Sequence, residues 1–188
     1  MNVMALDLEL NQPSGSIIQV GITIGDVNSG AVLEKQGWIT YIPEVINPYI
    51  TKLTTITQEQ VDAGILLVEA YKQMVALYKK HNCTLNFVTW GGGDHRELKR
   101  QLYEQKELLM PDEALMWEFG HREFDTKTIF LAFALADNKK VRSGLAKSMT
   151  RVGMAFKGTK HTAPDDAENT FLLLVHLLKN LPKGVLSK

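Results

Sequence analysis

The first strand-like stretch of the sequence is Val3-Met4-Ala5-Leu6-Asp7-Leu8-Glu9-Leu10, in which six of the eight residues are apolar. Successive side chains of a β-strand point to opposite faces, so we expect Asp7 and Glu9 to point the same way. Two neighbouring carboxylates repel each other, and burying them without a partner costs free energy. A divalent cation such as Mg²⁺ or Mn²⁺ removes this conflict, because both ions prefer hard oxygen ligands. The pair therefore predicts a metal site, and the alternative is a solvent-facing strand edge with two ordinary surface acids.

The composition is that of an ordinary globular protein, with 188 residues, 45% hydrophobic and 22% charged. This length suits one domain with a full hydrophobic core. The single cysteine, Cys83, excludes an intramolecular disulfide and a cysteine zinc cluster, and it is compatible with the reducing cytoplasm, where we expect the protein. We expect no signal peptide, because Asp7 and Glu9 interrupt the apolar stretch near the N-terminus, and no membrane span, because no apolar run is long enough.

The charges balance to a formal net charge of zero, which argues against a strongly basic coat for binding nucleic acid. Their distribution is uneven. Between Lys139 and Lys160 there are seven basic residues and no acidic one, whereas acids dominate residues 1–62. A basic flank beside an acidic site would suit a polyanion held next to metal ions, and the alternative is a solvated surface with chance clustering.

The predicted elements begin with an antiparallel meander of three strands and continue with alternating helices and strands. The first helix starts at a capping box of Thr57 and Gln60. The predicted strands cover residues 3–10, 16–24, 31–41, 85–90 and 118–125, and the predicted helices cover 58–80, 95–108, 126–136, 143–152 and 164–178. This order predicts an α/β fold in a single domain over residues 1–188, with a mixed five-stranded sheet, helices on both faces and the first strand at the centre.

Further acidic residues follow later elements. Asp94 comes directly after Gly91-Gly92-Gly93, whose missing side chains would let a ligand approach closely; the alternative is an ordinary helix N-cap. His161 precedes the last helix, which begins with Asp165 and Asp166 in its first turn. Helix-end electrostatics is the alternative explanation for these two acids. We expect Asp165 to point to solvent and Asp166 to point toward the sheet.

Together these motifs resemble those of the DEDD-type 3′-to-5′ exonucleases with a histidine in the third motif, in the ribonuclease H-like superfamily. The three matching segments are Asp7-x-Glu9, Asp94, and His161-x-Ala163-x-x-Asp166. Leu53-Thr54-x-Ile56-Thr57 is similar to a Leu-Thr-Gly-Ile-Thr segment of that family, with Thr55 in place of the glycine. The segment from Thr89 to Arg96 resembles Ser-Trp-Gly-Asp-Phe-Asp-x-Arg of the exoribonuclease branch, with Gly92 and Gly93 replacing Asp and Phe.

The resemblance covers residues 3–180 and implies two divalent cations, Mg²⁺ or Mn²⁺, as cofactors. Asp7 would contact both ions, Glu9 and Asp166 would complete the site of one ion, and Asp94 would serve the other. His161 would be the general base, because an imidazole with its unperturbed pKa of about 6.5 accepts a proton at neutral pH.

The resemblance implies that the strand is shortened from its 3′ end, and residues near the predicted site offer a physical basis for this polarity. Glu9 and the backbone near Leu8 and Leu10 would hold the terminal 3′-hydroxyl, and Leu53 would wedge against the terminal base. Trp90 would stack on a nucleotide, and the alternative is a buried tryptophan at a strand end. The basic segment would track the incoming strand.

The predicted function is therefore a two-metal-dependent 3′-to-5′ exonuclease that hydrolyses phosphodiester bonds at single-stranded 3′ ends, slightly favours RNA over DNA and releases nucleoside 5′-monophosphates. The first alternative is a DNA exonuclease of the proofreading or end-trimming type. The second is a catalytically inactive protein that binds nucleic acid. The expected partners are single-stranded 3′ ends of RNA or DNA, and the resemblance also admits a homodimer.

Overall fold

The computed structural model describes residues 1–84, 86–105 and 122–181, and these build one mixed sheet. Its strands are β1 (Asn2–Leu10), β2 (Ile17–Asp26), β3 (Val32–Ile39), β4 (Asn86–Thr89) and β5 (Arg122–Asp125). Their order across the sheet is β3-β2-β1-β4-β5, so β1 is central. The pairs β1–β2 and β2–β3 are antiparallel, whereas β1–β4 and β4–β5 are parallel. The predicted mixed five-stranded sheet is confirmed.

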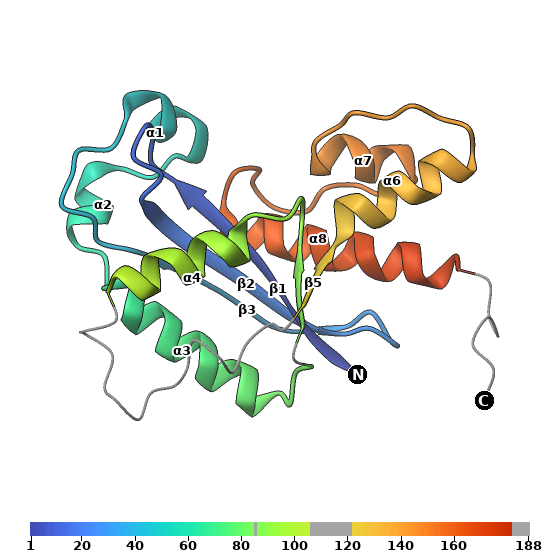
Figure 1. Ribbon diagram of the computed structural model, residues 1–188, viewed down its shortest axis with the longest axis horizontal. Helices are drawn as coiled ribbons and strands as arrows, with labels where there is room; N and C mark the ends of the chain where they lie inside the picture. The colour runs from blue at the N-terminus through green and yellow to red at the C-terminus, as the bar shows by residue number, and fades with distance from the viewer. Residues whose placement is uncertain (85, 106–121, 182–188) are drawn as a thin grey trace.

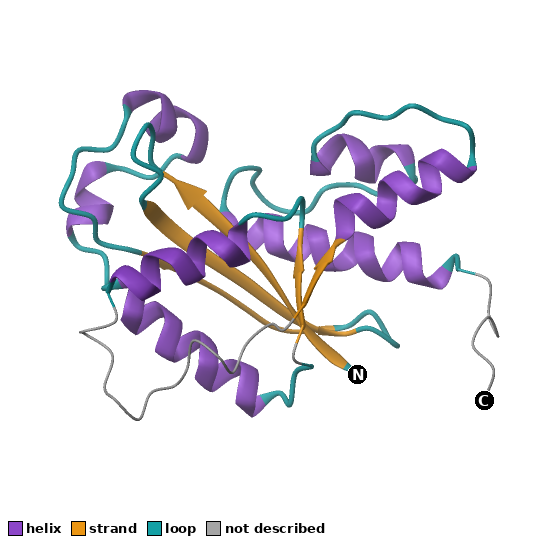
Figure 2. Cartoon of the chain, in the orientation of Figure 1, coloured by secondary structure: helices purple, strands orange, loops and turns teal. Residues whose placement is uncertain are grey.

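Helices cover both faces of this sheet, as predicted. They are α1 (Pro48–Thr54), α2 (Gln58–Asp62), α3 (Leu67–Lys80), α4 (Asp94–Glu104), α6 (Thr126–Ala136), α7 (Leu145–Arg151) and α8 (Ala163–Lys179). In Figure 1, α3 and α4 lie on one face of the sheet and α8 lies on the other, with α6 and α7 beside it. Figure 2 shows the same division between helices and strands. Within the described residues, no helix is both long enough and apolar enough to cross a membrane.

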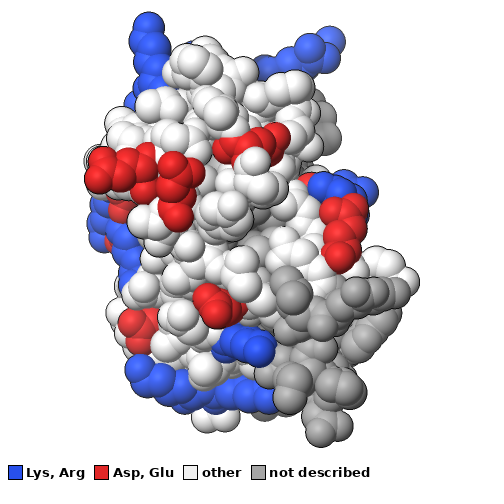
Figure 3. Space-filling model, turned by 90° about the vertical axis from the view of Figure 1, so that its left-hand side faces the viewer, with Lys and Arg blue, Asp and Glu red and all other residues white. Residues whose placement is uncertain are grey.

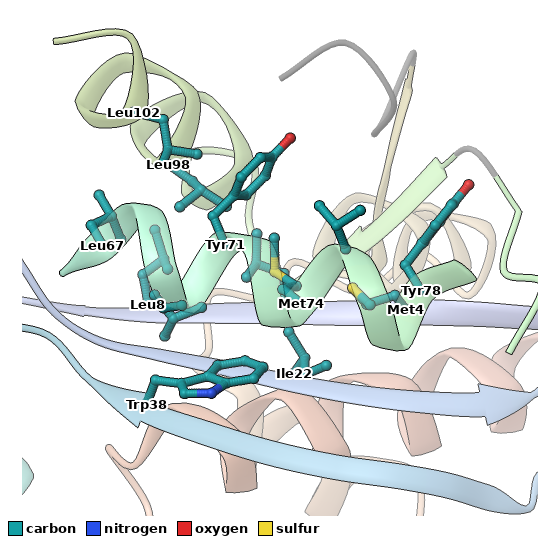
Figure 4. Close-up of a cluster of buried hydrophobic side chains, with 14 of the residues drawn as sticks. Met4, Leu8, Ile22, Trp38, Leu67, Tyr71, Met74, Tyr78, Leu98 and Leu102 are labelled. Carbon is teal, nitrogen blue, oxygen red and sulfur yellow. The ribbon is translucent and has the colours of Figure 1, made fainter. Parts of the chain in front are cut away.

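The even-numbered side chains of β1 form the core against α3. Met4, Leu6 and Leu8 are buried there, and α3 supplies an apolar stripe that includes Tyr71 and Met74. Figure 4 shows this stripe lying across the strands, with side chains of α4 packed above it. Because side chains alternate along a strand, the odd-numbered residues of β1 must face α8.

The N-terminal end of α8 packs directly on the backbone of β2 and β3. A Cβ atom at Gly21 would lie 2.0 Å from the carbonyl carbon of Ala163, and one at Gly37 would lie 2.9 Å from the ring of Pro164. Only glycine fits at Gly21 without moving the helix. Gly21 is also the register partner of Asp7, so this contact brings the start of α8 beside the acidic pair of β1.

The predicted helix over residues 58–80 is wrong, because the chain leaves the helix after α2 and starts a new one at Leu67. Between them, Ile65 pairs with the end of the meander: its N–H donates to Ile39 O at 3.1 Å and its carbonyl accepts from Tyr41 N at 2.9 Å. A Cβ at Gly64 would lie 2.7 Å from the Thr40 carbonyl carbon, so glycine allows this approach. The capping box of Thr57 and Gln60 is confirmed.

The helix α1 was not predicted, although the sequence carries a signal for it. Asn47 is the N-cap and its side chain accepts from Tyr49 N at 2.9 Å, while Pro48 stands at the first helical position. An Asn-Pro pair is typical of a helix start. The bounds of the other predicted helices agree with the structure within two residues where the structure describes them. Two predicted parts lie outside the described residues: the helix 95–108 after Gln105, and the strand 118–125 before Arg122.

Candidate active site

The side of β1 that faces α8 continues from the hydrophobic core into an open cleft of about 490 Å³. Val3 and Ala5 are buried in the core, and Asp7 and Glu9 follow them on the same face of the strand. Asp166 lies in the first turn of α8 and lines the same cleft. The residues that line the cleft are Asp7, Leu8, Glu9, Trp90, Gly144, Leu145, Ala146, Lys147, Phe156, Lys160, His161 and Asp166.

Asp94 is the first residue of α4 and is not its cap. Gly93 holds the N-cap position, and no side chain caps this helix end. The carboxylate of Asp94 is therefore not used for capping. It lies close enough to the cleft for its charge to raise the pKa values of Asp7 and Glu9, so it belongs to the same acidic group.

His161 lies on the loop between α7 and α8, next to two of the carboxylates. Ligand atoms of Glu9, His161 and Asp166 all lie within 4.8 Å of one another. The backbone N–H of His161 donates to Asp166 Oδ2 at 3.0 Å, and the residue has a left-handed φ of 61°. The imidazole itself is exposed on the rim of the cleft, where it can reach a bound substrate.

The crowding of these acids changes their protonation. Burial raises the pKa of Asp7 well above its ordinary value, and three neighbouring carboxylates raise it further. Burial raises the pKa of Glu9 to about 7, with added repulsion from Asp166 and Asp94. Burial and the charge of Glu123 raise the pKa of Asp94 to about 7. Without a compensating cation, the site holds protons near neutral pH.

The donor set fits divalent cations. Within the described residues, the carboxylates of Asp7, Glu9 and Asp94 form no ion pair with a basic side chain and accept no hydrogen bond. Asp166 accepts one hydrogen bond, at Oδ2 only. Burial raises its pKa too, although the hydrogen bond from His161 opposes the increase. Carboxylate oxygens in this uncompensated state are the ligands that Mg²⁺ and Mn²⁺ prefer.

Comparison with solved structures finds the same fold in several nucleases. Cell-death related nuclease 4 aligns with a TM-score of 0.78 at 17% identity, over 95% of this chain and 64% of that one. The nuclease domain of 3′hExo, a DEDDh family member solved with rAMP bound, aligns at 0.73 with 16% identity, over 95% and 92%. Pop2p of S. pombe, solved in a form with Mg²⁺ and Mn²⁺ bound, aligns at 0.66 with 14% identity, over 95% and 82%.

The chain has the ribonuclease H-like fold of the 3′-exonucleases. It spans 64% of the length of cell-death related nuclease 4. No protein-family model matches the chain, and no curated protein matches it in sequence. At identities of 13–17% the likeness is one of fold, and the chemistry has to be argued from the residues of the cleft.

Two of the four residues predicted to contact substrate lie at the cleft of this exonuclease fold. Leu8 and Trp90 line it, and Trp90 is half-buried, with its ring 6.2 Å from that of Phe130. Leu10 and Leu53 are partly buried and are not among the lining residues. All four substrate roles remain predictions.

The prediction that Asp165 points to solvent is wrong. Its side chain is only 18% exposed and pairs with Lys35 of β3. It also accepts from Thr159 N at 2.7 Å. Lys35 and Asp165 are 130 residues apart in the sequence, so their pairing depends on the tertiary fold.

Three residues that support the site of the exonuclease fold were missed in the sequence. Gln19 Oε1 accepts from Ala163 N at 2.9 Å and so fixes the first residue of α8. Gly21 lets that helix approach β2. Glu123 of β5 accepts from Thr89 Oγ1 at 2.6 Å, and its charge acts on Asp94. Of these, only Gly21 had a signal in the sequence, because a glycine inside a strand often marks a close backbone approach.

Proposed function

We propose that the chain is a 3′-to-5′ exonuclease that depends on two divalent cations, acts on single-stranded 3′ ends and prefers RNA to DNA. The observation that carries this proposal is a cleft lined by three raised-pKa carboxylates and one exposed imidazole, with a fourth raised-pKa carboxylate close enough for its charge to act on two of the three. These groups are Asp7, Glu9, Asp94, Asp166 and His161. They come from three segments that are far apart in the sequence: β1, the start of α4, and the loop that leads into α8 with its first turn.

The four carboxylates would hold the cations. When bound, two such ions stabilise the charge that develops on the entering and leaving oxygens of an in-line displacement at phosphorus. Asp7, whose pKa is raised by burial and by the charges of Asp94, Asp166 and Glu9, would contact both ions. Glu9 and Asp166 would serve one ion and Asp94 the other. Binding the ions would also relieve the repulsion that raises the pKa values of these groups.

His161 would accept the proton from the attacking water. The new P–O bond forms as the bond from phosphorus to the 3′-oxygen of the preceding nucleotide breaks, and this oxygen leaves with the bonding electrons and takes a proton from solvent water. The products are a nucleoside 5′-monophosphate and a strand one nucleotide shorter with a free 3′-hydroxyl. The exposed position of the imidazole on the rim suits this role, because the base must reach the water without displacing the carboxylates.

The rest of the cleft would bind the end of the strand. Trp90 and Phe156 offer aromatic surface to a base, and base stacking on such rings contributes roughly 1–3 kcal/mol per base. Lys147 and Lys160 offer positive charge to the phosphates. The preference for RNA is supported by the likeness to the 3′hExo nuclease domain solved with rAMP.

The test is a cleavage assay on matched RNA and DNA single strands labelled at the 5′ end, with Mg²⁺, Mn²⁺ or EDTA. We expect stepwise shortening from the 3′ end that EDTA stops, and faster shortening of RNA. Asp7→Asn should abolish it. His161→Ala should slow it by roughly 10²–10⁴-fold, the usual contribution of a positioned base, while calorimetry finds metal binding retained.

Asp62→Asn, an exposed acid on α2, is the matched control and should behave as the natural chain does. Strand binding without hydrolysis in either metal would overturn the proposal in favour of an inactive binding protein. Faster shortening of DNA would replace the RNA preference by the DNA exonuclease alternative. Internal cleavage or full activity in EDTA would refute the two-metal exonuclease assignment.

A further inference from the structure

We propose that Asp165 and Lys35 form a positioning pair that holds the loop carrying His161 in its working geometry. This inference rests on the proposed function, because it gives His161 the role of base. It assigns roles to two residues outside the group of metal-binding carboxylates. The pair joins β3, at the edge of the sheet, to the first turn of α8.

The loop between α7 and α8 is held by side chains of α8. Asp165 Oδ2 accepts from Thr159 N at 2.7 Å and lies 3.0 Å from Thr162 Oγ1. The Thr162 hydroxyl also lies 2.6 Å from Thr159 O. Residues on both sides of His161 therefore contact the same carboxylate, that of Asp165.

The backbone before His161 is shaped to fit this carboxylate. Gly158 has a left-handed φ of 74°, and a Cβ there would lie 2.4 Å from the Asp165 carboxyl carbon. A side chain at this position would therefore push the carboxylate away from the loop. Farther back, Asn169 Oδ1 accepts from Lys157 N at 2.9 Å and its Nδ2 donates to Lys157 O at 2.8 Å, so the middle of the loop is fixed separately.

Lys35 holds the other side of the same carboxylate. Its ammonium donates to Asp165 Oδ1 and to Glu168 Oε2, the latter at 2.8 Å. Lys35 uses Oδ1, and the loop uses Oδ2.

The consequence concerns the position of the base. His161 is exposed, and the hydrogen bond that holds it is the one from its backbone N–H to Asp166 Oδ2. Its placement therefore depends on the loop, and a displacement of about 1 Å in a catalytic group can cost roughly a hundredfold in rate. Asp165 does not line the cleft, so it acts through His161 and not on the substrate.

A double-mutant cycle on kcat tests this dependence. Asp165→Ala should lower kcat by roughly 30–100-fold in the natural chain, and by less than about threefold in a chain that already carries His161→Ala. Lys35→Met should lower kcat by roughly 3–10-fold, and Lys35→Arg should restore most of it. The Mg²⁺ concentration for half-maximal rate and the KM should change by less than about threefold.

Lys80→Met is the matched control, because Lys80 pairs with Glu34 at 3.1 Å on an exposed surface away from the loop. It should leave kcat unchanged. Equal effects of Asp165→Ala with and without His161 would overturn the inference in favour of a general structural role. A large shift in the Mg²⁺ requirement would overturn it in favour of an effect through Asp166.

Amide hydrogen exchange on the metal-free protein gives a readout that needs no activity. Lys35→Met should speed exchange at Thr159 N, whose acceptor is Asp165, and leave Lys157 N unchanged, because its acceptor is Asn169. Unchanged exchange at Thr159 would refute the pair. If His161→Ala cleaves as fast as the natural chain, the role of His161 in the proposed function fails. If His161→Ala lowers kcat but the Lys35 and Asp165 variants leave kcat unchanged, this inference alone fails.

Discussion

At the scale of single residues, the cleft brings together carboxylates whose burial and mutual repulsion disfavour their ionised forms. The pKa values of Glu9 and Asp94 are raised to about 7, first by burial and then by neighbouring acids. A folded carboxyl with a raised pKa binds its proton more tightly than the unfolded chain does. Between about pH 4 and pH 7 these groups therefore remove stability from the metal-free protein as the pH rises.

The loss of stability with rising pH can be measured by thermal unfolding in EDTA. The melting temperature of the natural chain should fall more steeply between pH 5.5 and pH 8 than that of Asp94→Asn, whose neutral amide no longer repels its neighbours. Saturating Mg²⁺ at pH 8 should raise the melting temperature of the natural chain and raise that of the variant much less. Calorimetry measures both. Parallel pH profiles for the two chains would contradict the electrostatic account.

At the scale of elements, the position of α8 decides whether the site forms. The helix starts against Gly21, and the N–H of its first residue donates to Gln19 Oε1. The ring of Phe171 lies against Gly25, where an added Cβ would be only 2.1 Å from the ring. The glycines of β2 therefore let a helix lie unusually close to the sheet. This closeness brings Asp166 next to the acids of β1.

Gly21→Ala should destabilise the protein by about 3 kcal/mol, because the added methyl overlaps the backbone at Ala163. The start of α8 must move to relieve the overlap, so the rate of strand shortening should fall together with stability. Chemical denaturation measures the free energy of unfolding. Gly144→Ala is the control, since a Cβ there meets nothing within 4 Å and should cost less than about 1 kcal/mol. Equal stabilities of the two variants would show that β2 and α8 do not touch as described.

A second element-scale prediction concerns the end of α1. Thr55 caps this helix in the left-handed conformation with a φ of 64°, which strains any residue with a Cβ. Its position matches the glycine of the resembled segment. Thr55→Gly should raise the free energy of unfolding by about 1 kcal/mol, and Thr55→Asn by less. Thr55→Ala keeps the Cβ and should give no gain; an equal gain from alanine would mean that strain is not the cause.

At the scale of the whole molecule, charge is separated although the net charge is zero. The basic segment between Lys139 and Lys160 includes α7 and the loop to α8, beside the cleft. The opposite end of the molecule, in Figure 3, carries several separate acidic patches and a row of basic side chains along the lower edge of the view. A polyanion is therefore expected to approach over α7.

The salt dependence of strand binding tests this approach. Lys147→Ala combined with Lys160→Ala should lower the slope of log affinity against log salt by roughly 1.4, about 0.7 for each lost phosphate contact on a single strand. Fluorescence anisotropy with a labelled RNA and the inactive Asp7→Asn chain measures it. Lys80→Ala combined with Lys179→Ala removes the same charge elsewhere and should change the slope little. Equal slopes for both pairs would mean that the cleft lysines do not contact phosphates.

The sequence by itself determined the features that depend on local geometry. The alternation of β1 put Asp7 and Glu9 on one side, and the capping box of Thr57 and Gln60 began a helix where predicted. The opening meander and the alternation of helices and strands after it predicted a mixed sheet with β1 at its centre, and the structure confirms both. The sequence positions of Asp94 and Asp166 left ordinary helix-end explanations open, and it was the resemblance to the exonuclease family that joined them to Asp7, Glu9 and His161 in one predicted site.

Only the tertiary structure decided the contacts between distant segments. The break at Gly64 arises because Ile65 pairs with Ile39 and Tyr41, and helix propensity alone does not reveal such a partner. The pairing of Asp165 with Lys35 spans 130 residues, and the glycine contact at Gly21 depends on where α8 lands. Local sequence sets the direction of a side chain, whereas its distant neighbours are fixed only when the whole sheet and its helices pack together.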